Sequence, residues 1–178
     1  MTQMKGDLES YHATDTLPGG QVIQLRAIRP NDREALHREF LKLSKQTVRD
    51  RFFSIKLDLT ESELTYFTEV DFDHHLALVA ELETAEGLVP AAVGRLVRVS
   101  GEPEHAEMAI TVTDAMQGLG IGKILLARLS ECARMLGIRH MDASVMAENT
   151  RMMRLIRKSG LAFSTEMHNG IQTISVDL

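Results

Sequence analysis

Cysteine, tryptophan and long hydrophobic runs are scarce in this chain of 178 residues. The single cysteine, Cys132, excludes an internal disulfide and a zinc site built from several cysteines, and it is typical of a reducing cytoplasm. No stretch approaches the roughly 18 consecutive apolar residues that a membrane-spanning helix needs. Residues 1–20 also lack the hydrophobic run of a secretory signal. We therefore expect a cytoplasmic protein that does not bind membranes.

Aromatic residues and excess positive charge are also scarce. The chain has no Trp, 2 Tyr and 6 Phe, so the base-stacking surface of a nucleic-acid-binding protein is not expected. Lys and Arg number 20 against 25 Asp and Glu, yet residues 117–160 hold eight basic and only three acidic residues. This local excess favours a site for an anionic ligand. Solvated helix faces explain it equally well.

The order of hydrophobic patterns predicts an α/β protein with one mixed, mostly antiparallel sheet flanked by helices. The predicted element order is β-α-α-β-β-β-α-β-α-β-β. Residues 1–21 are polar and are interpreted as an N-terminal arm, and residues 22–178 as a single domain. The predicted strands cover residues 22–28, 75–83, 91–100, 105–113, 139–146, 161–167 and 171–178, and helices are predicted within 31–67 and over 122–136 and 149–159.

The segment from Glu107 to Lys123 is the most informative about chemistry, and it reads EMAITVTDAMQGLGIGK. A strand runs into a glycine-rich turn and then into the predicted helix 122–136. Glycines allow a ligand to approach the backbone, and a helix start offers free N–H groups and positive dipole charge to a pyrophosphate. The turn lacks both the G-x-G-x-x-G pattern of a dinucleotide fold and the Gly-Lys-Ser/Thr spacing of a P-loop.

The spacing Gln-x-x-Gly-x-Gly, formed by Gln117, Gly120 and Gly122, resembles the coenzyme A signature of the GNAT acetyltransferases. Downstream, the pattern NxxMMxLxxxxGL that starts at Asn149 is similar to the second cofactor-binding helix of that superfamily. The upstream elements and the Asn-Gly hairpin signal extend the resemblance over residues 22–178. Most similar are the acetyltransferase domains of bacterial protein-lysine acetyltransferases, through RFF at 51–53, LTESEL at 59–64, VDFD at 70–73 and ALVA at 77–80.

The resemblance implies acetyl-CoA as co-substrate and assigns residues to its binding. The end of the strand 105–113 aligns with the backbone that pairs with the pantetheine arm, where the strand splays from its parallel neighbour 139–146 and leaves amides unpaired. The glycine turn aligns with the pyrophosphate loop, and Asn149 with a polar contact. The implied cofactor-binding residues are Ile110, Thr111, Val112, Gln117, Gly118, Leu119, Gly120, Ile121, Gly122, Lys123 and Asn149.

Glu107 aligns with the residue that is commonly the family's general base. An amine attacks a thioester only when it is neutral, and near pH 7.4 only about one lysine in 10³ is neutral, so a positioned base is useful. Glu107 lies in a mostly apolar strand, where partial burial would raise the pKa of its carboxylate towards a value useful for a base. The alternative is a structural, solvent-facing residue. Glu81 and Asp73 are reserve candidates. Many family members carry a Tyr that acts as general acid for the departing thiolate, and the corresponding position here is Ile156.

We therefore expect an acetyl-CoA-dependent N-acetyltransferase that acts on a primary amine, with a protein lysine as the first choice. A small-amine or amino-acid acetyltransferase and a non-catalytic acetyl-CoA-binding module stay open, and so does a homodimer. No metal is expected, because adjacent histidines such as His74 and His75 point to opposite faces of a strand. Cys132 lies on the apolar stripe of the helix 122–136 and is interpreted as a core residue.

Overall fold

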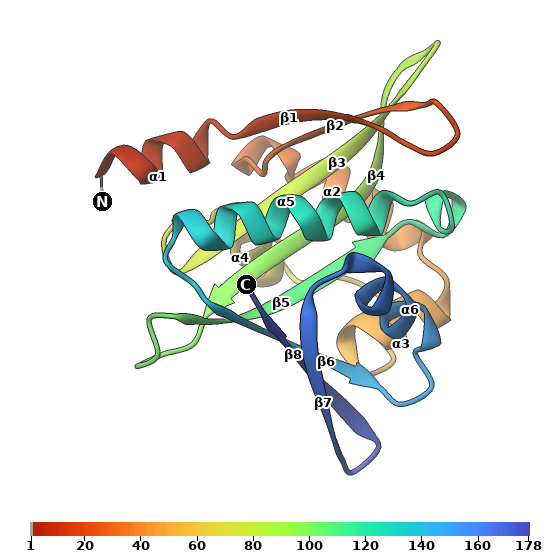
Figure 1. The fold of residues 1–178 in the computed structure, drawn as a ribbon. Coiled ribbons are helices and arrows are strands. Elements are labelled where there is room, and N and C mark those ends of the chain that lie inside the picture. Colours follow the sequence, from red (N-terminus) through yellow and green to blue (C-terminus); the bar gives the residue numbers. More distant parts are fainter. Residues whose placement is uncertain (1) are drawn as a thin grey trace.

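An eight-stranded sheet forms the centre of the computed structural model, which describes residues 2–178 (Figure 1). The strand order is β1-β2-β3-β4-β5-β6-β8-β7, and every neighbouring pair is antiparallel except β5 and β6. This confirms the predicted mixed, mostly antiparallel α/β class. The strands are β1 (His12–Thr16), β2 (Val22–Ala27), β3 (His75–Thr84), β4 (Gly87–Arg98), β5 (His105–Val112), β6 (His140–Met146), β7 (Ala162–His168) and β8 (Ile171–Asp177).

Helices cover both faces of the sheet. They are α1 (Thr2–Glu9), α2 (Arg33–Lys42), α3 (Lys45–Phe52), α4 (Glu61–Thr68), α5 (Ile121–Met135) and α6 (Thr150–Ser159). Three α-helices separate β2 from β3, whereas the predicted order has two. Leu43 is extended and Ser44 caps α3 by accepting a hydrogen bond from the Thr47 amide, so the chain breaks between α2 and α3.

The long helix α5 packs on one face of the central strands, and α2, α3 and α4 lie on the other (Figure 1). Leu125, Leu129 and Cys132 of α5 are fully buried in the main core, as the apolar stripe predicts. Burial raises the pKa of the Cys132 thiol to about 12, which leaves it unreactive at neutral pH. Gly94 of β4 permits this packing, since a Cβ there would lie 2.6 Å from the Leu129 side chain.

The N-terminal residues differ from the polar arm predicted over 1–21, because they are part of the packed structure. Strand β1 extends the sheet by pairing with β2 from His12↔Arg26 to Thr16↔Val22. Leu8 and Leu17 are both buried in the main core, with exposed fractions of 0% and 2%. Two apolar anchors thus hold a segment whose composition is otherwise polar.

Replacing Leu8 by alanine is expected to lower the free energy of unfolding by about 2–5 kcal/mol, because a buried leucine leaves a cavity when it is truncated. Urea unfolding measures the change. Leu57→Ala is the matched control, since Leu57 is 84% exposed and its loss is expected to change stability by less than about 0.5 kcal/mol. Equal stabilities of the two variants would show that the N-terminal segment does not contribute to the fold.

Candidate active site

The two parallel strands at the middle of the sheet part from one another. Strands β5 and β6 pair only from His105↔His140 to Glu107↔Asp142, although β5 continues to Val112 and β6 to Met146. Figure 1 shows the two strands diverging beyond this short seam. The split is the one predicted between these strands, and it leaves a cleft bordered by main-chain groups of β5.

The cleft encloses about 1070 Å³, at the upper end of the range of small-molecule sites. It brings together all of the residues that the sequence predicted for the site, which come from β5, the turn after it, α5 and the start of α6. They are Glu107, Ile110, Thr111, Val112, Gln117, Gly118, Leu119, Gly120, Ile121, Gly122, Lys123 and Asn149. Residues as far apart in the sequence as Glu107 and Asn149 therefore meet at one opening.

The glycine turn has the backbone conformation that makes glycine necessary. Gly118 and Gly120 have φ angles of 82° and 96°, in the left-handed region that other residues rarely adopt. Gly120 is the N-cap of α5, whose first residues, Ile121 and Gly122, line the cleft and carry N–H groups that precede the first hydrogen bond of the helix. The predicted basic excess gathers at the same cleft as the side chains of Lys123, Arg151, Arg154 and Lys158. An anionic ligand fits this end of the cleft.

Gln117 and Asn149 both use their side chains to hold the cleft in shape. The Gln117 amide nitrogen donates to the Val112 carbonyl at 3.1 Å and to the Thr47 hydroxyl at 3.2 Å, which ties the end of β5 to α3. The Asn149 side-chain oxygen accepts from the Met152 amide at 3.1 Å and caps α6. Both residues therefore position the walls of the cleft.

Glu107 lies at the seam, where the cleft meets the face of the sheet that α3 and α4 cover. It pairs in register with Val97 of β4 and Asp142 of β6, so these three side chains share a face. The side chain is exposed, so the expected partial burial is wrong. Among the described residues Glu107 has no hydrogen bond or ion pair, whereas Asp142 lies 2.9 Å from the His105 ring. The Glu107 carboxylate is therefore open to the cleft.

The same face of the cleft holds three residues that the sequence analysis missed, namely Arg51 of α3, Tyr66 of α4 and Arg95 of β4. Tyr66 is half-exposed and its ring lies 4.7 Å from the His75 ring. Arg95 was detectable, because a charged residue inside the apolar run VGRLV is unusual unless it serves a site. We call the surface formed by Glu107, Arg51, Tyr66 and Arg95 the acceptor face.

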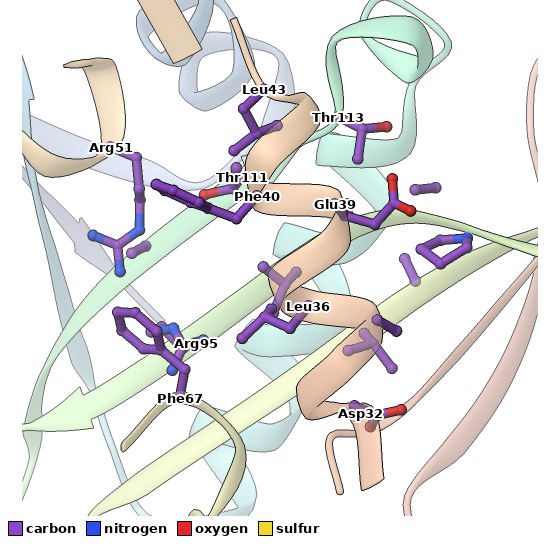
Figure 2. A pocket seen from close by; sticks show the side chains of 18 of the residues that line it. Asp32, Leu36, Glu39, Phe40, Leu43, Arg51, Phe67, Arg95, Thr111 and Thr113 are labelled. Atoms are coloured by element: carbon purple, nitrogen blue, oxygen red, sulfur yellow. The ribbon is translucent and has the colours of Figure 1, made fainter. Parts of the chain in front are cut away.

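The reserve candidates lie elsewhere. Glu81 makes an ion pair with Arg26 at 3.0 Å and lines a separate cavity of about 110 Å³ between α2 and the sheet (Figure 2). Asp73 lies 3.6 Å from Arg98. Ile156 is fully buried, so the position that carries a Tyr in many family members does not face the cleft here.

Neither a metal centre nor a membrane-spanning helix is found in the part of the chain that the structure describes. No three His, Cys, Asp or Glu side chains within residues 2–178 are grouped so that they could hold a metal ion. Asp71 instead accepts hydrogen bonds from the amides of Asp73, His74 and His75, which forms a turn into β3. No helix in this range is both long and apolar enough to cross a bilayer.

Parted parallel strands followed by a glycine turn and a helix start define an acetyltransferase of the GNAT class. The family model for the acetyltransferase (GNAT) domain matches residues 23–162. The chain belongs to this family. It is a GNAT acetyltransferase domain, as the resemblance of its motifs implied.

Two relatives and one solved structure show how this domain compares with other members. The chain is 33% identical over 147 residues to acetyltransferase Pat of Mycolicibacterium smegmatis, covering 83% of this chain and 43% of that protein. It is 26% identical over 167 residues to acetyltransferase PA5475 of Pseudomonas aeruginosa, covering 94% and 89%. The crystal structure of the GNAT domain of S. lividans PAT superposes with a TM-score of 0.85 at 29% identity, covering 94% and 97%. The chain thus spans less than half the length of the Mycolicibacterium relative.

Proposed function

We propose that this domain transfers the acetyl group of acetyl-CoA to the side-chain amine of a lysine in a protein, with Glu107 as the general base. One observation carries the proposal. The carboxylate of Glu107 has no partner among the described residues, and it lies at the seam between β5 and β6 where the cofactor cleft meets the acceptor face. An amine that enters from the acceptor face therefore contacts the Glu107 carboxylate before it reaches the thioester of acetyl-CoA.

The chemistry requires the loss of two protons from nitrogen and one exchange of bonds. The ammonium group of the acceptor gives a proton to Glu107, and the neutral nitrogen attacks the thioester carbonyl. The carbon–nitrogen bond forms, the carbon–sulfur bond breaks and the sulfur leaves as a thiolate, and the second proton of the nitrogen passes to this thiolate or to water. A thiol has a pKa of about 8.5, so the thiolate departs without a side-chain acid at the buried position Ile156. We also propose that the main chain of Ile110–Val112 contacts the pantetheine arm of acetyl-CoA and that the glycine turn binds its pyrophosphate.

The surroundings of the cleft favour a protein as the acceptor. Phe53 lines the cleft and is 40% exposed, and the loop that follows it carries Ile55 and Leu57 with exposed fractions of 89% and 84%. Exposed apolar side chains beside a site are typical of surfaces that contact another protein. Glu107 and Asp142 add negative charge that attracts a lysine ammonium group. We also propose a cytoplasmic location, and a homodimer stays a prediction.

An acceptor panel tests the proposed function. The protein is incubated with acetyl-CoA and either lysine-containing proteins, free amino acids or small amines, and release of free CoA is measured together with acetyl incorporation by mass spectrometry. We expect equimolar CoA release and acetyl-lysine, with the highest kcat/KM for a protein lysine. A higher kcat/KM for a small amine would overturn the assignment of the acceptor. Binding of acetyl-CoA without transfer to any acceptor would identify a non-catalytic binding module.

A further inference from the structure

Two arginine side chains meet in the acceptor face, Arg51 from α3 and Arg95 from β4. Both line the cleft and also one end of the small cavity beneath α2 (Figure 2). Arg95 is only 5% exposed. In the sheet register it lies opposite Ala109, two residues along β5 from Glu107, so Arg95 and Glu107 are diagonal neighbours on one face. Such neighbours have Cβ atoms roughly 7–8 Å apart.

The contacts of the two arginines involve only neutral groups. Arg95 donates to the His75 ring nitrogen at 2.9 Å, and its guanidinium lies 4.5 Å from the centre of the Phe67 ring. Burial lowers the pKa of His75 to about 4, so this ring is neutral at neutral pH and can accept the bond. The Arg51 guanidinium lies 5.1 Å from the centre of the Phe52 ring. Within residues 2–178 neither arginine has a carboxylate at ion-pair distance.

Other partly buried arginines of this protein do have carboxylate partners. Arg26, which lines the same small cavity, forms ion pairs with Asp32 at 2.8 Å and Glu81 at 3.0 Å. Arg128 pairs with Asp15 at 2.8 Å. Arg51 and Arg95 therefore differ from these arginines in lacking a carboxylate partner among the described residues.

Two positively charged side chains without a carboxylate partner in the wall of the cleft destabilise the protein when no ligand is bound. Burial lowers the pKa of Arg51, and burial together with the neighbouring Arg51 lowers the pKa of Arg95 to about 9. Both groups still carry a positive charge at neutral pH. An anion placed between them relieves both the desolvation and the mutual repulsion. The cleft is the opening through which such an anion reaches them.

We propose that Arg51 and Arg95 form a carboxylate subsite of the acceptor, so that the amine acetylated at Glu107 belongs to a substrate that carries a carboxylate a few ångströms away. The inference rests on the proposed function, because it assigns the amine to Glu107. The planar forks of two guanidinium groups match a carboxylate. The phosphates of the donor have their own basic residues at the far end of the cleft, beyond Val112. The carboxylate is either that of the acceptor itself or that of an acidic residue beside the lysine.

Two isosteric acceptor pairs test the subsite and distinguish its two sources. One pair is a peptide with Asp beside the lysine and the same peptide with Asn, and the other is free lysine and lysinamide. We expect the wild-type protein to prefer the carboxylate member of one pair by about 10–100-fold in kcat/KM, the range for hydrogen bonds to a charged group. A preference in the peptide pair identifies a neighbouring side chain, and one in the other pair identifies the α-carboxylate.

Arg51→Met and Arg95→Met should each abolish this preference by raising KM for the carboxylate member. The kcat/KM of the uncharged member should change far less than that of the carboxylate member, and the melting temperature should be retained, because an apolar side chain of similar size replaces an unpaired buried charge. Arg49→Met is the matched control on α3, since the Arg49 side chain makes an exposed ion pair with Glu148. It should keep the wild-type preference. Equal rates within both pairs for the wild type, or a preference that both variants retain, would overturn the subsite.

A binding measurement separates failure of the subsite from failure of the proposed function. If no acceptor is acetylated, the proposed function is wrong, and the subsite is then judged by melting temperature in propionate against chloride at equal ionic strength. Stabilisation of the wild type by propionate that is lost in Arg95→Met and Arg51→Met would support the carboxylate subsite. Equal melting temperatures in the two salts would exclude it.

Discussion

Replacing Glu107 by glutamine is expected to lower acetyl transfer at neutral pH by about 10²–10⁴-fold, the usual contribution of a positioned base. Glutamine keeps the shape of the side chain but cannot accept the amine proton. Raising the pH should restore part of the loss, because more of the acceptor is then neutral without assistance. Steady-state rates of wild type and variant between neutral and alkaline pH measure both effects.

Two controls make this result specific to proton transfer. The affinity for acetyl-CoA and the stability of Glu107→Gln should stay at the wild-type level, because the side chain is exposed and unpaired among the described residues. Glu86→Gln, in the turn between β3 and β4, should leave turnover unchanged. Undiminished turnover of Glu107→Gln with an unaltered pH profile would show that another group, or water, deprotonates the amine.

The second large effect is expected from Gly122→Val, which should abolish binding of acetyl-CoA while the domain stays folded. Gly122 has no unusual φ angle, and a Cβ there would make ordinary contacts of 3.5 Å with Leu155 and 3.8 Å with Val112. The branched methyl groups of valine would then occupy the cleft beside the helix start, where a pyrophosphate approaches the backbone. Gly120 is a poorer choice, because its φ of 96° and a contact of 3.2 Å with Pro18 would strain any side chain.

Thermal unfolding with and without acetyl-CoA measures this effect. At a ligand concentration of 100 times Kd, the wild type should gain about 2.7 kcal/mol and Gly122→Val should gain nothing. Ala127→Val is the matched control, because it adds the same side chain to an exposed position of α5. Wild-type affinity in Gly122→Val would mean that the glycine turn serves the fold alone.

The sequence was most informative where local chemistry determines the backbone. The apolar stripe of α5, the Asn-Gly hairpin between β7 and β8 and the glycines of the turn each act through neighbouring residues. Their bounds were therefore predicted to within a few residues. The residues predicted for the donor line one cleft, because Gly118 to Lys123 are contiguous and Asn149 caps the next helix.

The parts that the sequence did not predict depend on contacts between distant segments. Strand β1 reads HATDT and alternates between exposed and half-buried residues, and the buried leucines Leu8 and Leu17 lie outside the strand itself. The acceptor face combines side chains from α3, α4, β4 and β5 that no spacing relates. The exposure of Glu107 likewise depends on the parting of β5 from β6, which is a property of the whole sheet.

That parting has a consequence for how the site can change under mutation. Beyond Glu107, β5 presents main-chain groups that no longer pair with β6, and these groups are the same for every amino acid that maintains a strand. Substitutions at Ile110–Val112 that keep an extended backbone should therefore leave donor recognition intact. The acceptor face is built from side chains, so a single replacement at Arg51, Tyr66 or Arg95 alters it directly. One domain can thus keep its acyl donor while its acceptors diverge.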